Sequence, residues 1–295
     1  MRPILCKIGP VPIFSYGLLI AAGFLVSVHL MRRDAKKAGI DPDRFTDGAF
    51  WVLFLGLAGT RLLHIILYYQ QYSWTDPLEW IAIWKGGLVF QGAIPPAILF
   101  CIYYIRKHHL NFWQCADIAC PYIPLGHAFG RLGCFMNGCC YGHVTDLPWG
   151  IPFPRVPSDL SLPATGSPVY LDHFGSHSVP HDALWSNPVH PTQLYSVAGL
   201  LCLFALILVL RKRWHPFTGF TLPTYFFAYS VFRFFVEFLR GDHNPTHFGG
   251  HLTDQQVFCL ATAAACALLF AFLYRRAAVK QSGQSQRKGK LSSAK

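Results

Sequence analysis

Arginines and one glutamate occupy apolar parts of the sequence, where a charged side chain needs a functional reason. Arg131 lies in the stretch GHAFGRLGCFMNGCCYG (126–142), and Arg233 and Glu237 lie in YSVFRFFVEFLRGDH (229–243). A planar guanidinium can bind a phosphate with two hydrogen bonds, and a low-dielectric surrounding strengthens that contact. The glycines of the first stretch allow the backbone to approach a ligand closely. These residue types therefore predict a site for a phosphate-bearing ligand, such as a lipid headgroup.

The second stretch carries its polar side chains at helical spacing. Tyr229, Arg233, Glu237 and Arg240 follow one another by four, four and three residues, so they project from one face of a helix. The alternative is structural. In the second stretch, the charged residues would form a salt bridge that only stabilises the helix. In the first stretch, Arg131 would extend to the lipid headgroups, and the glycines would serve helix packing. An ion pair in hydrocarbon is costly unless both partners are satisfied, so its presence favours function.

Further polar residues lie in other apolar segments. They are Arg61 with His64, the loop WKGGLVFQG (84–92) with Gln91, Tyr16, and the sequence HPTQLY (190–195), which begins at His190. Each of these is also typical of ordinary packing, and a histidine in such a position is often a satisfied interface residue.

The elements that must position these residues are predicted to be membrane-spanning helices. The chain has 295 residues, of which 53% are hydrophobic and only 13% are charged, well below the charged fraction of a soluble domain. Apolar windows of about 20 residues are long enough to cross a bilayer. Seven such windows occur, near 11–30, 49–69, 87–105, 115–135, 192–210, 218–238 and 254–274.

The distribution of positive charge predicts the topology. Although the net charge is +11, 17 of the 25 Lys and Arg residues fall in four segments at alternate helix ends, which argues against a nucleic-acid surface. The positive-inside rule then places the N-terminus outside and the C-terminus in the cytoplasm. We therefore predict an all-α polytopic membrane protein with about seven transmembrane helices.

The prediction for the domains is one transmembrane catalytic domain over 1–278, followed by a tail. The segment 139–190 is rich in Pro, Gly, Ser and His, which predicts a cap of loops and short elements on the outer face. The tail, 279–295, consists mostly of Gln, Ser, Gly, Lys and Arg, and this composition predicts a disordered basic segment. The segment is expected to be solvated, and anionic lipid is the one partner that its positive charge suggests.

The cysteines and histidines raise two alternatives. Cys134, Cys139 and Cys140 cluster in sequence and could indicate a thiol oxidoreductase, although the sequence has no C-x-x-C motif there and adjacent cysteines would form a strained disulfide. The outer segment also holds His173, and histidines follow it at positions 177 and 181. The intervening Phe, Gly, Ser and Pro residues disfavour a helix that would align the three as metal ligands.

Taken together, these motifs resemble the prolipoprotein diacylglyceryl transferase family. The resemblance extends from Tyr16-Gly17 through the glycine loop and HPTQLY to the helix that carries Arg233. Against the family signature GR-x-GNFxNGExxG the chain reads GRLGCFMNGCCYG, so the matching positions include Arg131, Asn137, Gly138 and Gly142. Cys134 and Cys139 replace an Asn and a Glu, and Gln91 stands where well-known members have a histidine; these changes belong to a variant form of the signature.

The resemblance implies transfer of the diacylglyceryl group from phosphatidylglycerol to the lipobox cysteine of preprolipoproteins, with release of glycerol phosphate. It implies location in the bacterial cytoplasmic (inner) membrane among membrane lipids, and neither a metal nor a nucleotide cofactor. Arg131 and Arg233 would hold the phosphate, with Arg240 as a weaker third cation. The remaining residues expected to bind substrate are Asn137, Gly138, Gly142, Gln91, Tyr229 and His190.

The proton acceptor is left open by the sequence. Gln91 cannot take a proton at neutral pH, so Tyr16, Glu237 and His190 are the alternatives, and Glu237 could instead orient Arg233. Cations near the approaching thiol would also favour its thiolate form. A transporter or a lipid-binding scaffold is the competing class of function, in which the arginines line a substrate path.

Overall fold

A computed structural model describes most of the chain as helices. It covers residues 4–8, 11–72, 76–82, 86–155, 167–180, 182–242 and 246–292; the side chains of residues 7, 8, 11, 12, 71, 77, 78 and 280–292 lie outside the description. Trp84, Lys85 and His181, which the sequence analysis considered, lie outside the described residues. The chain divides into two compact units, residues 1–27 with 119–295, and residues 28–118, and each is described by itself.

The smaller unit pairs two helices through glycines. It contains the C-terminal part of α1 (Ser15–Lys37), then α2 (Pro42–Leu67), η1 (Tyr69–Gln71), α3 (Pro77–Ile81), η3 (Phe90–Ala93), α4 (Ile94–Lys107) and α5 (Phe112–Ala119). Helix α2 packs against η3 and α4. A Cβ on Gly59 would lie 2.3 Å from the Gly92 carbonyl oxygen, and the reverse is equally close. Only glycine therefore permits this approach of the two backbones.

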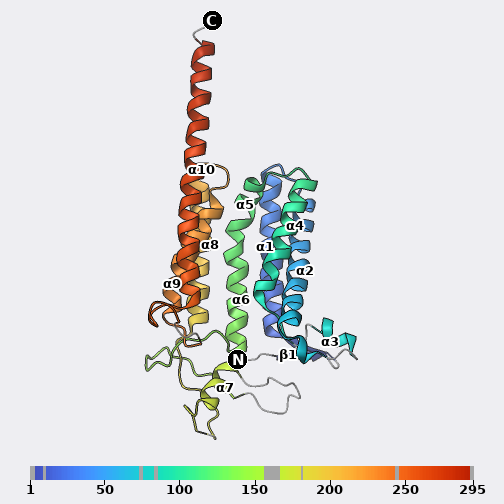
Figure 1. Cartoon of the computed structure of the whole chain (residues 1–295), viewed down its shortest axis with the longest axis vertical. Coiled ribbons are helices and arrows are strands. Elements are labelled where there is room, and N and C mark those ends of the chain that lie inside the picture. Colours follow the sequence, from blue (N-terminus) through green and yellow to red (C-terminus); the bar gives the residue numbers. More distant parts are fainter. Residues whose placement is uncertain are drawn as a thin grey trace. The chain divides into compact units, whose positions relative to one another are not determined.

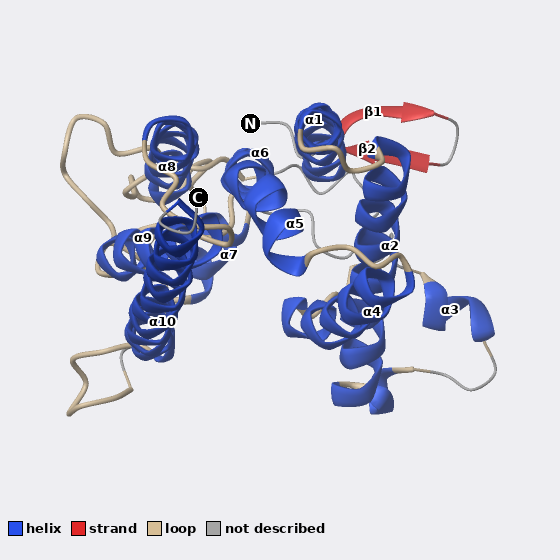
Figure 2. Cartoon of the chain, turned by 90° about the horizontal axis from the view of Figure 1, so that it is seen from above, coloured by secondary structure: helices blue, strands red, loops and turns tan. Residues whose placement is uncertain are grey.

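The larger unit packs its long helices in series. It begins with a hairpin of β1 (Ile4–Ile8) and β2 (Val11–Phe14) and the first turns of α1, and continues with η4 (Cys120–Tyr122), α6 (Ile123–Asn137), α8 (Thr192–Arg213), α9 (Thr221–Glu237) and α10 (Asp254–Ser292). Helix α6 packs against α8, α8 against α9, and α9 against α10. Figure 2 shows these four helices from one end.

The β-hairpin differs from the all-α prediction. The first apolar window begins at residue 11, but residues 11–14 form strand β2, and α1 begins at Ser15. Short apolar runs rich in Ile and Val fit a strand and a helix equally well by hydropathy, so the window merged the two.

The segment 139–190 of the larger unit has its own small core. Tyr141, Phe153, Val169 and Val189 are buried together, although they come from separate loops and from α7 (Pro168–Gly175). Isolated β-bridges, among them Ile151 to Val189, tie these loops together. Figure 1 shows α7 at one end of α6, α8 and α9, with the C-terminal end of α10 at the other. The described part of 139–190 thus consists of loops and short elements, and its place on the outer face stays a prediction.

Four described helices are long and apolar enough to cross a membrane: Ser15–Lys37, Pro42–Leu67, Thr192–Arg213 and Asp254–Val279. The chain is therefore a helical membrane protein. The other three predicted windows are also largely helical but shorter or broken. Helix α4 has 14 residues, or about 21 Å against a hydrocarbon core of about 30 Å. Prolines interrupt the fourth window at η4 and α6, and α9 has 17 residues.

Helix α10 continues to Ser292, into the segment whose composition predicts disorder. Adding residues to an existing helix avoids the cost of nucleation, so even a polar segment can extend a stable span. The helical backbone of this segment is the finding, and its contact with lipid stays a prediction.

Candidate active site

A buried ion pair on α9 is the centre of the candidate site. Arg233 Nη1 and Glu237 Oε2 are 2.5 Å apart, and their side chains are 6% and 0% exposed. The spacing of four residues that the sequence showed therefore does place both groups on one face of a helix. Apolar residues otherwise dominate this helix, so the pair is held in a medium of low dielectric.

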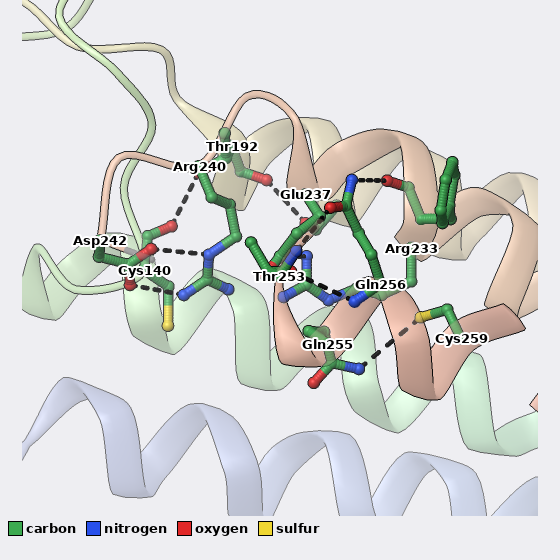
Figure 3. A network of polar contacts seen from close by, with 12 residues as sticks. Cys140, Thr192, Arg233, Glu237, Arg240, Asp242, Thr253, Gln255, Gln256 and Cys259 are labelled. Carbon is green, nitrogen blue, oxygen red and sulfur yellow. Dashed lines mark hydrogen bonds and ion pairs between the residues drawn. The ribbon is translucent and has the colours of Figure 1, made fainter. Parts of the chain in front are cut away.

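The start of α10 supports the pair. Thr253 Oγ1 donates to Glu237 Oε1 over 3.1 Å, while the Thr253 backbone N–H donates to Gln256 Oε1 over 2.9 Å. The Gln256 N–H in turn donates to Thr253 Oγ1, which completes a capping box at the helix start. Figure 3 shows this network, with Arg240, Asp242 and Cys140 grouped beyond Glu237. The sequence analysis missed Thr253 and Gln256, although their Thr-x-x-Gln spacing signals such a cap.

Arg131 lies on α6, within electrostatic range of Arg233 and Cys140. Its Nε donates to His127 Nε2 over 3.4 Å, and the His127 ring lies 5.4 Å from that of Tyr229 on α9. His127 therefore connects the two helices that carry the arginines. It was missed in the sequence, although its spacing of four residues from Arg131 is a usable signal.

Arg240 follows α9 and is bound by a carboxylate. Its Nε and Nη2 donate to the two Asp242 oxygens over 2.8 and 2.5 Å, and its side chain is 5% exposed. Burial alone would lower the pKa of the Arg240 guanidinium, but the hydrogen bonds to Asp242 raise it above its ordinary value. Arg240 therefore stays charged, with part of its charge offset by Asp242.

The glycine signature forms a turn that contacts the start of α8 and the end of α9. Gly138 ends α6 with φ of 74°, in the left-handed region, beside the exposed Asn137. After the turn, the Gly142 N–H donates to the His190 carbonyl over 3.0 Å, and Gly142 pairs with Arg240 in an antiparallel bridge. The signature glycines thus hold together the end of α6, the start of α8 and the end of α9.

We expect Gly142→Ala to destabilise the protein by about 1–3 kcal/mol, the usual cost of overpacking. A Cβ at this position would lie 2.5 Å from His190 Cβ and 2.6 Å from the Leu239 carbonyl oxygen. Gly130→Ala is the matched control, because a Cβ there meets nothing within 4 Å. Thermal unfolding of the detergent-purified variants measures the difference; equal midpoints would contradict the close packing described for Gly142.

Tyr16 and three thiols complete this region of the larger unit. A Cβ on Gly133 would lie 2.7 Å from Tyr16 Cδ2, so the tyrosine ring covers this glycine. The Tyr16 hydroxyl lies within electrostatic range of Arg131 and of Cys134, Cys139 and Cys140. The larger unit therefore brings together most of the predicted site: Tyr16, Arg131, Asn137, Gly138, Gly142, His190, Tyr229, Arg233, Glu237 and Arg240.

His190 makes local contacts. Its Nδ1 lies 3.4 Å from the Tyr195 hydroxyl oxygen, and that oxygen accepts a hydrogen bond from Trp149 Nε1. The next two residues after Pro191 anchor the signature: Thr192 Oγ1 donates to the Cys140 carbonyl and Gln193 Nε2 to the Cys139 carbonyl, each over 2.8 Å. The motif HPTQLY thus orients the turn that follows α6, and contact of His190 with substrate stays a prediction.

Arg61 has a structural environment in the smaller unit. Its guanidinium donates to four backbone carbonyls, those of Glu79, Trp80, Gly86 and Gly87, at 2.5–3.1 Å. Gly86 and Gly87 have φ of 88° and 72°, so their flexibility lets the loop present its carbonyls to one side chain. Gln91 follows in η3 and is exposed. Arg61 therefore shapes the glycine loop.

Arg61→Lys is expected to lower the free energy of unfolding by about 1.5–3 kcal/mol, the contribution of one hydrogen bond to a charged group. A lysine ammonium cannot reproduce the planar fork that reaches four carbonyls. Arg44→Lys is the control, because the Arg44 side chain is 55% exposed and forms an ion pair with the exposed Asp41. The midpoints of thermal unfolding should fall for the first variant and not for the second; an unchanged midpoint for Arg61→Lys would remove its structural role.

The family model described as "Prolipoprotein diacylglyceryl transferase" matches residues 3–272. A "Phosphatidylglycerol--prolipoprotein diacylglyceryl transferase" of Nostoc sp. is 32% identical over 281 residues, which cover 93% of this chain and 90% of the relative. Proteins of the same description from Geobacter sulfurreducens and Vibrio parahaemolyticus are 33% and 31% identical, over 81% and 97% of this chain and 82% and 96% of the relatives.

Proposed function

Because the chain belongs to the prolipoprotein diacylglyceryl transferase family, we infer that it transfers the diacylglyceryl group of phosphatidylglycerol to the lipobox cysteine of preprolipoproteins. A thioether forms and glycerol phosphate leaves. This reaction is the first step of lipoprotein maturation.

The observation that carries this function is the grouping of Arg131, Arg233 and Arg240 around a largely buried region of the larger unit. In the reaction, sulfur attacks a glyceryl carbon while the phosphate ester leaves with the electron pair. Negative charge therefore grows on the phosphate, and preorganised cations in a low-dielectric site stabilise it more than water does. A family of lipid transferases needs such a site, and these side chains can supply it.

We assign roles to the site residues on this basis. Arg131 and Arg233 hold the phosphate, and Arg240 contributes less because Asp242 takes two of its hydrogen bonds. Glu237 orients Arg233. Substrate contacts are proposed for Tyr16, Asn137, Gly138, Gly142, Gln91, Tyr229 and His190.

The topology we propose has seven crossings, with the N-terminus outside and the C-terminus in the cytoplasm. The opposite placement of the cap and the end of α10 supports it for the larger unit. The excess of Lys and Arg at alternate helix ends supports it for the whole chain. We place the protein in the bacterial cytoplasmic membrane, where lipid and exported preprolipoprotein meet.

The decisive experiment incubates the purified protein with phosphatidylglycerol labelled in its acyl chains and with a lipobox peptide. We expect label to enter the peptide through a thioether, detected by mass spectrometry. A peptide with serine in place of cysteine is the control. Saturable lipid binding without any thioether product would instead support the lipid-binding scaffold or transporter.

The pH dependence of Glu237→Gln tests the role of this carboxylate. The rate of a base-catalysed step falls as pH drops through the pKa of the base, because protonation removes the acceptor. Glu237 contacts Arg233 and Thr253 and its side chain is 0% exposed, so we expect the acidic limb of the pH–rate profile to be unchanged. Loss of that limb in the variant would identify Glu237 as the base.

A further inference from the structure

In the proposed reaction the lipobox thiol must lose a proton, and Glu237, Tyr16 and His190 are poorly suited to take it. The Glu237 side chain is 0% exposed, and its two oxygens contact Arg233 and Thr253. A phenol such as that of Tyr16 keeps its own proton at neutral pH, so it donates before it can accept. The ring of His190 contacts a tyrosine of its own motif, and among the described residues it makes no hydrogen bond to an arginine of the site.

His127 lies beside both arginines that bind the phosphate in the proposed reaction. It precedes Arg131 by one turn of α6, and its Nε2 accepts the hydrogen bond from Arg131 Nε over 3.4 Å. Its ring lies 5.4 Å from that of Tyr229 on α9, and it is within electrostatic range of Arg233. Among the described histidines, it is the one that hydrogen-bonds an arginine of the site. The imidazole is therefore located where sulfur and phosphate would have to meet.

The contact with Arg131 defines the protonation state of the ring. A guanidinium can only donate, so His127 Nε2 must present its lone pair and the ring must be neutral. The distance of 3.4 Å is longer than the usual value of about 2.9 Å, so an approaching S–H group can replace this weak contact. A neutral imidazole with an available lone pair is the most common proton acceptor in enzymes at neutral pH.

The helix face around His127 has room for substrate. His127, Gly130, Arg131 and Cys134 follow one another by three, one and three residues, so they share one face of α6. A Cβ on Gly130 would meet nothing within 4 Å, which leaves open space on this face. His127 and Arg131 are both only partly buried. A thiol can thus approach His127 while the phosphate binds Arg131.

We propose that His127 Nε2 is the proton acceptor for the lipobox thiol, an inference that rests on the proposed function. The S–H bond gives its proton to Nε2, and the sulfur electron pair forms the bond to the glyceryl carbon. The carbon–oxygen bond to the phosphate breaks, and its electron pair leaves with glycerol phosphate, which Arg131 and Arg233 bind. The imidazolium then releases its proton to water, which restores the neutral ring.

Titratable and charged groups near His127 come from several elements. They are Arg131 on α6, Tyr229 and Arg233 on α9, and Cys140 in the turn after α6. The Cys140 thiol belongs to a cluster with those of Cys134 and Cys139, all within 4.8 Å of one another. Helix α8, which also packs against α6, has charged residues only in its last turn. Helix α1 contributes Tyr16 further along α6, beside Gly133.

Charge balance favours proton transfer to His127 once lipid is bound. In the free protein, a proton on the ring would add a positive charge beside Arg131 and Arg233. The bound phosphate brings a negative charge, and this charge grows as the ester bond breaks, so the imidazolium forms next to an anion. The ring therefore gains its proton in the same step in which the phosphate gains charge.

The first test is His127→Gln, which removes the proton acceptor and keeps a hydrogen-bond acceptor for Arg131. We expect the rate of thioether formation with a cysteine lipobox peptide to fall by about 10²–10⁴, the usual contribution of a general base. His29→Gln is the matched control, because His29 is exposed on α1 and should leave the rate unchanged. A wild-type rate for His127→Gln overturns the proposal.

A selenocysteine lipobox peptide separates a proton acceptor from a residue that only positions Arg131. A selenol is already ionised at neutral pH, so its attack needs no acceptor. His127→Gln should therefore modify the selenocysteine peptide at close to the wild-type rate. Arg131→Ala should be slow with both peptides, because Arg131 acts on the leaving phosphate. An equal loss with both peptides in His127→Gln means that His127 only positions Arg131, and it overturns the assignment.

The pH–rate profile gives a second readout. The wild-type rate with the cysteine peptide should fall as pH drops, because a protonated His127 cannot accept, and it should level off at higher pH. The residual rate of His127→Gln should instead rise up to about pH 8.5, where the peptide thiol ionises by itself. Tyr16→Phe and His190→Gln should keep the acidic limb; its loss in either of them, with the limb retained in His127→Gln, overturns the proposal.

The wild type decides the proposal even where His127→Gln does not fold. Its acidic limb should be present with the cysteine peptide and absent with the selenocysteine peptide, and a limb shared by both peptides overturns the proposal. Product formation also separates this inference from the proposed function. Absence of any product from wild type with either peptide counts against the transferase function itself, whereas an active wild type with an equally active His127→Gln overturns only the role of His127.

Discussion

Arg131→Ala is expected to lower the rate of diacylglyceryl transfer by about 10²–10³, because one preorganised donor to a developing charge is worth about 2.7–4 kcal/mol. The loss should appear mainly in the chemical step, since the charge on the phosphate grows in the transition state. The protein should still insert and fold. Arg131 is only partly buried, and its one described side-chain hydrogen bond is the long contact to His127.

Two further variants test whether the loss of rate comes from the guanidinium of Arg131. Arg131→Lys keeps a positive charge and loses the planar fork, so its rate should lie between those of wild type and Arg131→Ala. Arg155→Ala removes an exposed arginine from the segment 139–190 and should leave the rate unchanged. The measurement is the initial rate of thioether formation at saturating lipid. Wild-type rates for Arg131→Ala would end its assignment as a phosphate ligand.

The sequence predicts the centre of the site because its signals are local. Arg233 and Glu237 are four residues apart in one helix, so periodicity alone places them on one face, and the structure confirms their contact. Arg131 is conspicuous because a charge within an apolar run is expensive. Hydropathy likewise predicts a helical membrane protein, and four described helices are long enough to confirm that class.

The rest of the site depends on turns at the helix ends and on contacts between distant segments, and helical periodicity reports neither. Thr253 reaches Glu237 only because α10 packs on α9, and Asp242 reaches Arg240 only because the chain turns sharply after α9. The convergence of Cys134 with Cys139 and Cys140 likewise requires the left-handed conformation at Gly138. Hydropathy also cannot separate strand β2 from α1, since both are apolar.

Arg233→Ala is expected to have two effects, on activity and on stability. Transfer should fall by at least as much as in Arg131→Ala, since a second phosphate ligand is lost. In addition, the Glu237 carboxylate would remain buried without its cation, and breaking a buried pair in this way costs about 3–5 kcal/mol. The midpoint of thermal unfolding in detergent and the rate of thioether formation measure the two effects separately.

A double variant distinguishes a catalytic Arg233 from a purely structural one. Arg233→Met combined with Glu237→Leu replaces the buried pair with apolar groups of similar volume, a change that is often neutral or stabilising. We therefore expect the unfolding midpoint to return toward that of wild type while the rate stays as low as in Arg233→Ala. If stability and transfer both recovered, the ion pair would serve only to hold α9 in place, and Arg131 would have to bind the phosphate without it.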